Sequence, residues 1–133
     1  MATNAFQNAR AVMIFDFAPV TPPGAGATVT ADVTCARGFD LIDAHALATA
    51  TVAGSTATLA RQALGAGAFV TCSTAIAMAT DGTVTRQVAG MVTAQRVFVS
   101  TDVFRCSFID GGAGSANGHC YAHILPNAIT GAS

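Results

Sequence analysis

Residues 102–109 (DVFRCSFI) place a phenylalanine or cysteine at every second position, and this pattern decides the fold class. Successive side chains of a β-strand point to opposite faces, so the pattern predicts a strand with one buried face. That face would carry Phe104, Cys106 and Phe108. A loop of small residues follows at 110–118, with a composition typical of a connection between strands.

Residues 119–125 (HCYAHIL) alternate in the same way after that loop. We expect a second strand whose apolar face carries Cys120, Ala122 and Ile124. The opposite face would present a polar row, exposed to solvent or to an interface, made of His119, Tyr121 and His123. The two segments are predicted to pair as a hairpin with a long loop.

The upstream sequence contains two further extended segments. Residues 28–34 (TVTADVT) alternate strictly, and residues 39–51 (FDLIDAHALATAT) form a longer extended segment. We predict a two-residue hairpin turn at Gly54-Ser55, because glycine suits the first turn position. That turn would place Thr51 opposite Thr58 in the neighbouring strand.

The stretch from 65 to 99 leaves alternatives open. Residues 73–79 (STAIAMA) are compatible with a short helix or an apolar strand, and residues 91–99 leave the same choice. Asp81-Gly82 predicts a turn, after which residues 83–88 (TVTRQV) alternate as a strand. At most one short helix is therefore expected.

One domain is expected for a chain of 133 residues. Residues 1–27 contain an apolar run at 10–17 (RAVMIFDF), read as a strand, and a linker rich in proline and glycine, which disfavour a sheet ladder. We expect this N-terminal part to be an extended arm that swaps onto a neighbouring subunit, or an integral strand. Residues 28–133 are predicted to form an all-β domain, a compact antiparallel β-sandwich or β-barrel-like fold, with a short flexible C-terminal tail.

Charged residues are scarce, since Arg and Asp make up 10% of the chain and both Lys and Glu are missing. Ordinary soluble domains contain roughly 25% charged residues. A GC-rich genome would account for the missing lysine but not for the missing glutamate, which is used mainly on exposed helix faces. The composition therefore indicates few surface helices and a surface covered by other subunits. The net charge of −1 and the scattered arginines argue against nucleic-acid binding.

Neither a signal peptide nor a membrane span is predicted. The N-terminus lacks a positive segment followed by an apolar run. Residues 62–80 are uncharged, but Gln, Gly, Ser and Thr interrupt them and large apolar residues are few.

The four cysteines show no CxxC spacing, and without an export signal we expect reduced, buried thiols. The same reasoning argues against a disulfide between Cys106 and Cys120, although the predicted hairpin would bring them together. Nor does any local motif support a cysteine nucleophile paired with a histidine such as His45.

His119 and His123 are the strongest candidates for metal ligands. Four residues of a strand span about 13 Å, which places the two imidazoles too far apart for one ion. Asp40 and Asp43 are the only near pair of carboxylates, and three residues apart on a strand they are predicted to point to opposite faces. We therefore predict no catalytic, cofactor-binding or metal-ligating residues.

Four segments, taken together over about residues 28–126, carry a family resemblance. They are FDLIDAHALATAT, TVAGSTATL, TAIAMATDGTVTRQV and CYAHILP. In order and spacing the chain resembles small virion proteins of tailed bacteriophages, in particular capsid decoration (cement) proteins. The resemblance implies an all-β, non-enzymatic and commonly trimeric protein on the outer shell. His119 and His123 depart from the pattern, since apolar or hydroxyl residues are expected there.

We therefore predict a capsid decoration protein that binds the major capsid protein lattice and stabilises the phage head. It would be a homotrimer on the outer capsid surface of the virion, assembled in the host cytoplasm, with neither nucleic acid nor membrane as a partner. Two alternatives remain open. One is a tail or head-fibre module that binds a host surface glycan, and the other is a small hydrolase with a Cys or His site.

Overall fold

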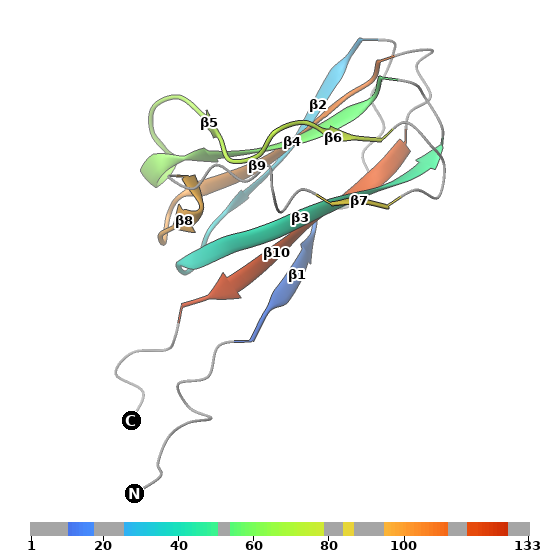
Figure 1. The fold of residues 1–133 in the computed structure, drawn as a ribbon. Helices are drawn as coiled ribbons and strands as arrows, with labels where there is room; N and C mark the ends of the chain where they lie inside the picture. Colours follow the sequence, from blue (N-terminus) through green and yellow to red (C-terminus); the bar gives the residue numbers. More distant parts are fainter. Residues whose placement is uncertain are drawn as a thin grey trace, which may run out of the picture.

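The computed structural model describes residues 11–17, 26–50, 54–78, 84–86, 95–111 and 117–127. Their strands form two antiparallel sheets that face each other (Figure 1), which confirms the all-β class and its sandwich form. Within these residues the helical structure is confined to short 3-10 turns such as η1 (Ala63–Gly65).

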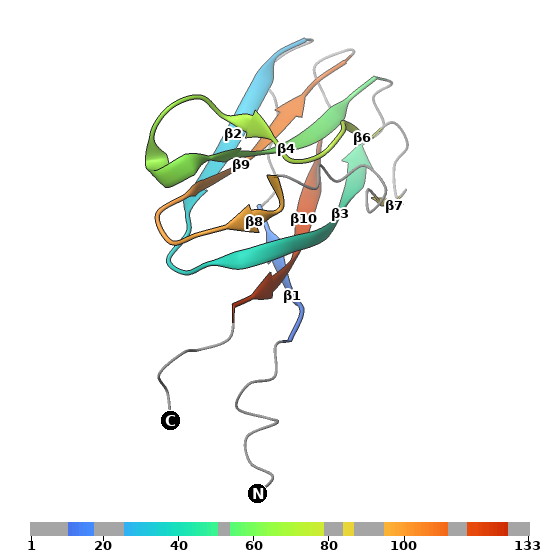
Figure 2. The same ribbon diagram turned by 60° about the vertical axis from the view of Figure 1, so that its left-hand side comes forward.

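The first sheet, which we call sheet A, has the strand order β1-β10-β3-β7, with β8 also pairing with β3. Its long central strands are β3 and β10, and β1 forms one edge (Figure 2). The strands are β1 (Met13–Asp16), β3 (Phe39–Ala50), β7 (Val84–Arg86), β8 (Val97–Phe98) and β10 (Asn117–Pro126). β1 lies within the apolar run predicted as a strand, and it pairs with β10 of the same chain.

The second sheet, sheet B, has the order β2-β9-β4-β5, and β6 also pairs with β4. Its strands are β2 (Thr28–Thr34), β4 (Thr56–Gln62), β5 (Val70–Thr71), β6 (Ile76–Ala77) and β9 (Val103–Ile109). The strand predicted at 28–34 is confirmed. The open choice at 73–79 is decided in favour of a strand, β6, while the turn predicted at Asp81-Gly82 lies outside the described residues.

Both predicted hairpins are wrong, because in each case the chain moves from one sheet to the other. β3 belongs to sheet A and β4 to sheet B, where Thr58 lies opposite Ser107 of β9. β9 and β10 are divided in the same way. Each strand has one apolar face, and placing the two faces against each other across the core buries both. Local turn signals do not distinguish this arrangement from pairing within one sheet.

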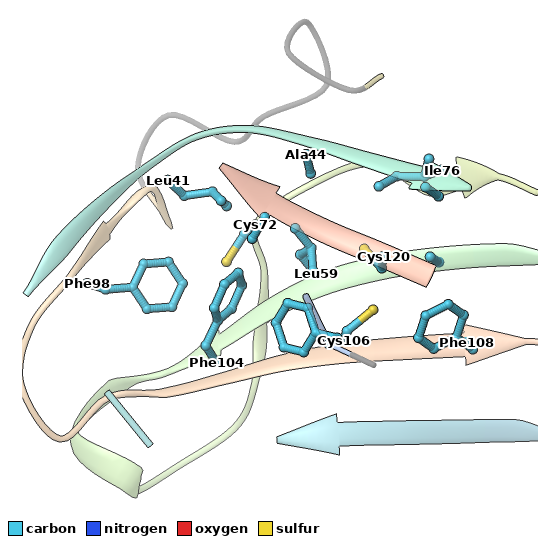
Figure 3. Close-up of a cluster of buried hydrophobic side chains, with 14 of the residues drawn as sticks. Leu41, Ala44, Leu59, Cys72, Ile76, Phe98, Phe104, Cys106, Phe108 and Cys120 are labelled. Atoms are coloured by element: carbon cyan, nitrogen blue, oxygen red, sulfur yellow. The ribbon is translucent and has the colours of Figure 1, made fainter. Parts of the chain in front are cut away.

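The core lies between the sheets and is filled from both sides (Figure 3). Phe104, Cys106 and Phe108 of β9 are buried, as the alternation predicted. Cys120 of β10 is also fully buried, and the four cysteines of the chain are buried free thiols. A hydrogen bond with Cys120, and then burial, raise the pKa of the Cys106 thiol, which therefore stays protonated near neutral pH.

A buried carboxylate fastens the turns at one end of sheet B. Asp102 is fully buried and its side chain accepts three hydrogen bonds. The donors are Arg61 Nε at 2.7 Å, the backbone N–H of Leu64 at 2.8 Å and that of Val99 at 2.9 Å. Burial alone would raise the pKa of Asp102, but these donors outweigh it and lower the pKa. The carboxylate is therefore held as an anion that joins β4, η1 and the residue that follows β8.

Two glycines meet at the opposite end of sheet B. Gly54 precedes β4 with a φ of 81°, a left-handed conformation that favours glycine. Gly111 follows β9, and a Cβ atom placed on it would overlap the backbone of Gly54. The backbone N–H of Gly111 also donates to the hydroxyl of the buried Ser55 at 3.3 Å. This close approach explains why a side chain is excluded at position 111.

Candidate functional site

The outer side of sheet A carries the polar row predicted on β10. Cys120 and Ala122 point into the core and are fully buried. The alternating positions His119, Tyr121 and His123 are only half-buried, on the opposite side of the strand. The division of β10 into an apolar and a polar face is therefore confirmed.

β3 adds His45 to this row, which sequence reasoning did not identify as a neighbour. His45 lies opposite Tyr121 in the register of β3 with β10, so both side chains share the outer side. Its Nδ1 atom is 2.6 Å from Nε2 of His123, and its ring stacks on Tyr121 with the centroids 4.7 Å apart. We call His45, His119, Tyr121 and His123 the His–Tyr face. All three histidines of the chain belong to it.

The row continues to β1 through His119. Its Nδ1 atom lies 3.4 Å from the carboxylate of Asp16, and its ring stacks on Tyr121 with the centroids 5.7 Å apart. Asp16 is 43% exposed, so water screens this contact. Together with Asp16, the His–Tyr face thus extends over three adjacent strands, from the centre of sheet A to its edge.

A β-bulge corrects the prediction for Asp40 and Asp43. Asp43 lies opposite His123, whereas the next paired residues are Leu41 and Ile124, so Ile42 has no partner on β10. The extra residue reverses the alternation of β3. Asp40, which lies opposite Leu125, therefore faces the same side of sheet A as Asp43 rather than the opposite side. Asp43 is almost fully buried, and its carboxylate accepts a hydrogen bond from the backbone N–H of Ala44 at 2.7 Å.

The His–Tyr face is suited to recognition by hydrogen bonds. In the part of the chain that the structure describes, no group of three or more His, Cys, Asp or Glu side chains is arranged to hold a metal ion. His119 and His123 contact different partners, Asp16 and His45, as their spacing on a strand requires. The contact between His45 and His123 needs one neutral ring, because an N–H of one imidazole must meet a lone pair of the other.

The cysteines are turned away from the His–Tyr face. Cys106 and Cys120 point into the core, on the other side of sheet A from the histidines. Burial raises the pKa of Cys35 to about 11 and that of Cys72 to about 12, so both thiols stay protonated near neutral pH. A buried thiol of this kind is a poor nucleophile. The described geometry therefore does not assemble the Cys–His pair that a hydrolase would need.

The free edge of sheet A is apolar. β1 pairs with β10 on one side, and no strand among the described residues pairs with its other side. Three consecutive residues here have exposed side chains, Val12 at 54%, Met13 at 56% and Ile14 at 59%. We call them the β1 edge patch. Edge strands of soluble proteins usually carry charges, bulges or prolines that prevent pairing with another chain.

Comparison with known proteins does not indicate a function for the chain. No family model matches the chain, and no curated protein is significantly similar to it. In the described residues, no helix has the length and apolar character needed to cross a membrane.

Proposed function

We propose that the chain is a structural subunit that assembles through the β1 edge of sheet A, and that it serves as a bacteriophage capsid decoration protein. In this role a homotrimer binds the major capsid protein lattice on the outer surface of the virion and stabilises the head. Nucleic acid, membranes and catalysis have no part in it.

The β1 edge patch is the observation that supports assembly most strongly. An apolar edge strand offers unpaired backbone N–H and C=O groups together with apolar side chains, which is what another chain needs in order to pair with it. Val12, Met13 and Ile14 are each more than half exposed in the isolated chain, so covering them would remove apolar surface from water. With a tenth of the residues charged, the chain has few charges elsewhere to keep such an edge in solution.

The His–Tyr face supplies polar contacts beside this apolar patch. Ile14 lies opposite His123 and Asp16 lies opposite Tyr121, so the patch and the face are continuous across β1 and β10. Interfaces commonly combine an apolar centre with a polar rim that fixes the orientation of the partner. This combination favours a specific assembly contact.

The alternative of a tail or head-fibre module that binds a host glycan ranks second. A sugar ring stacks on an open aromatic face, but the ring of Tyr121 is stacked with both His45 and His119. The number of copies per particle separates the two functions. Hundreds of copies indicate decoration, whereas a few to a few dozen indicate a tail component.

The decoration function is tested with virions that lack the protein and are then supplied with purified protein. We expect the depleted virions to release DNA at a lower temperature, and the wild-type protein to restore DNA retention. Ile14→Asp, which places a charge in the β1 edge patch, should fail to restore it. Thr30→Asp is the matched control, because Thr30 is an exposed residue of β2, the edge strand of sheet B.

Two results would contradict this function. Depleted and complete virions that retain DNA equally well would remove the cementing role. Equal restoration by the Ile14→Asp and wild-type proteins would show that the decoration function does not need assembly through the β1 edge.

A further inference from the structure

Two buried cysteines from different sheets meet in the core. Cys106 is on β9 of sheet B and Cys120 is on β10 of sheet A, and both side chains point into the space between the sheets (Figure 3). Both residues are fully buried, and their side chains share a hydrogen bond. Because β9 and β10 belong to different sheets, this contact joins sheet A to sheet B.

The core side of sheet A carries small side chains around Cys120. Ala46 lies opposite it on β3, and Ala122 is the next residue of β10 on the same side; both alanines are buried. An alanine occupies little space, so the two sheets can approach closely at this level. A disulfide needs Cβ atoms about 3.5–4.5 Å apart, and other β-sandwiches hold such a bond between their facing sheets. The contact of Cys106 with Cys120 is therefore compatible with a disulfide.

The other two cysteines have different surroundings. The thiol of Cys72 donates to the backbone carbonyl of Val70, with sulfur and oxygen 3.8 Å apart. Cys35 lies in the wall of an apolar pocket between the sheets, and the charged groups that act on its thiol are those of Asp102 and Arg61. Within the described residues, the contact between two thiols is therefore that of Cys106 with Cys120.

We propose that Cys106 and Cys120 form a disulfide across the core when the chain folds in the presence of a small disulfide oxidant, and that this bond fastens sheet A to sheet B. The thiolate of one cysteine attacks the oxidant and forms a mixed disulfide, from which the thiolate of the other displaces the remaining half. Two S–H bonds are lost and one S–S bond forms. The two electrons and two protons pass to the oxidant, which leaves as two thiols.

Burial determines when this reaction occurs. A cysteine reacts as its thiolate, and in the folded chain the Cys106 thiol is fully buried and stays protonated near neutral pH. In the unfolded chain both thiols are exposed to the oxidant. We therefore expect the bond to form during folding, and the folded, reduced chain to be oxidised at least about tenfold more slowly. The bond is independent of the proposed capsid function, because it lies in the core and not at the β1 edge patch.

The test is refolding of the full, reduced chain from urea with an excess of oxidised glutathione. N-ethylmaleimide is then added in denaturant to alkylate the thiols that remain, and the monomer is analysed by mass spectrometry. We expect two alkylated cysteines and one internal disulfide. Endoproteinase Asp-N separates all four cysteines, because an aspartate lies between each successive pair. The disulfide should link the peptides 102–109 and 110–133.

Four variants and a melting curve complete the test. Cys106→Ala and Cys120→Ala should each abolish the internal disulfide. Cys35→Ala and Cys72→Ala are the matched controls, because they also remove a buried cysteine, and both should keep it. The oxidised wild-type chain should melt about 5–10 °C above the reduced chain, since the cross-link restricts the unfolded state.

The proposal is overturned if the refolded chain keeps four alkylated cysteines, or if the linked peptides contain Cys35 or Cys72. It is also overturned if the oxidised chain melts at or below the temperature of the reduced chain, because the bond would then not fit the folded core. Equal rates of oxidation for the folded and the refolding chain would contradict the protection by burial. The peptide map of the wild-type chain decides the pairing even if a variant does not fold.

Discussion

β1 and β2 are edge strands of sheets A and B, and they expose different kinds of side chain. β2, the edge of sheet B, exposes Thr30 and Asp32, and Asp32 accepts two hydrogen bonds of 2.7 Å from the guanidinium of Arg105. β1, the edge of sheet A, exposes instead the three apolar side chains of the β1 edge patch. Sheet B thus ends in a polar edge made by its own side chains, whereas the edge of sheet A is suited to be covered by another molecule.

The two sheets also differ in their other contacts. Sheet B is fastened at one end by the hydrogen bonds of Asp102 and at the other by the contact of Gly54 with Gly111. Sheet A carries the His–Tyr face and the apolar edge. We therefore expect substitutions in sheet B to change the stability of the fold, and substitutions at the edge of sheet A to change assembly.

The largest loss of stability is expected for Asp102→Asn. The substitution removes the negative charge that pairs with Arg61 and weakens the hydrogen bonds from the Leu64 and Val99 N–H groups. Because Asp102 is fully buried while Arg61 is 21% exposed, we expect a loss of roughly 3 kcal/mol. Urea denaturation measures the change in the free energy of unfolding. Asp32→Asn, which affects the exposed pair with Arg105, is the control and should cost less than about 1 kcal/mol. Equal losses for both variants would contradict the role given to Asp102.

A smaller loss is expected for Gly111→Ala. A Cβ atom at position 111 overlaps the backbone of Gly54, so the two turns must separate, at a cost of about 1–3 kcal/mol. Gly67→Ala is the comparison, because Gly67 has a positive φ of 83°, which Gly111 does not, and no atom lies within 4 Å of a Cβ placed there, so its cost reflects backbone strain alone. Denaturation curves should show a greater loss for Gly111→Ala. A loss for Gly111→Ala no greater than that for Gly67→Ala would contradict the tight contact between the two turns.

Acid should destabilise the fold through the same carboxylate. The pKa of Asp102 is lower in the folded chain than the ordinary value of 3.8, so the unfolded chain takes up the proton more readily. The stabilisation by ionised Asp102 is fully present above that ordinary value and is lost as the pH falls through the lower folded value. Melting temperatures measured between about pH 2 and pH 6 should therefore drop below about pH 4. The drop should be smaller in Asp102→Asn, and an identical drop would assign the acid sensitivity to other groups.

The strands and their faces were predictable from the sequence, because alternation is a local property of the chain. Spacing alone predicted a strand at residues 28–34, which is β2 in the structure. It also predicted the buried positions of Phe104, Cys106 and Phe108. Pairing was not predictable in the same way. Which strands are neighbours in a sheet depends on how their apolar faces are buried across the core. For this reason β3 and β4, and likewise β9 and β10, lie in different sheets although they follow each other along the chain.

The candidate site shows the same limit. The outward direction of His119 and His123 followed from the alternation of β10, but their neighbours did not. His45 is distant in sequence, and only the register of β3 with β10 brings it to His123. The bulge at Ile42 has no glycine or proline that would indicate it in the sequence. Strict alternation along the strand therefore could not predict that Asp40 and Asp43 face the same side of the sheet.

The central claim is that the edge of sheet A is an assembly surface and the edge of sheet B is not. Light scattering coupled to gel filtration tests it most directly, as the mass in solution of the wild-type protein, Ile14→Asp and Thr30→Asp, with circular dichroism to confirm that each is folded. We predict an oligomer for the wild type and Thr30→Asp, and a monomer for Ile14→Asp. A monomeric wild type, or an Ile14→Asp variant that keeps the oligomeric mass, would contradict the claim.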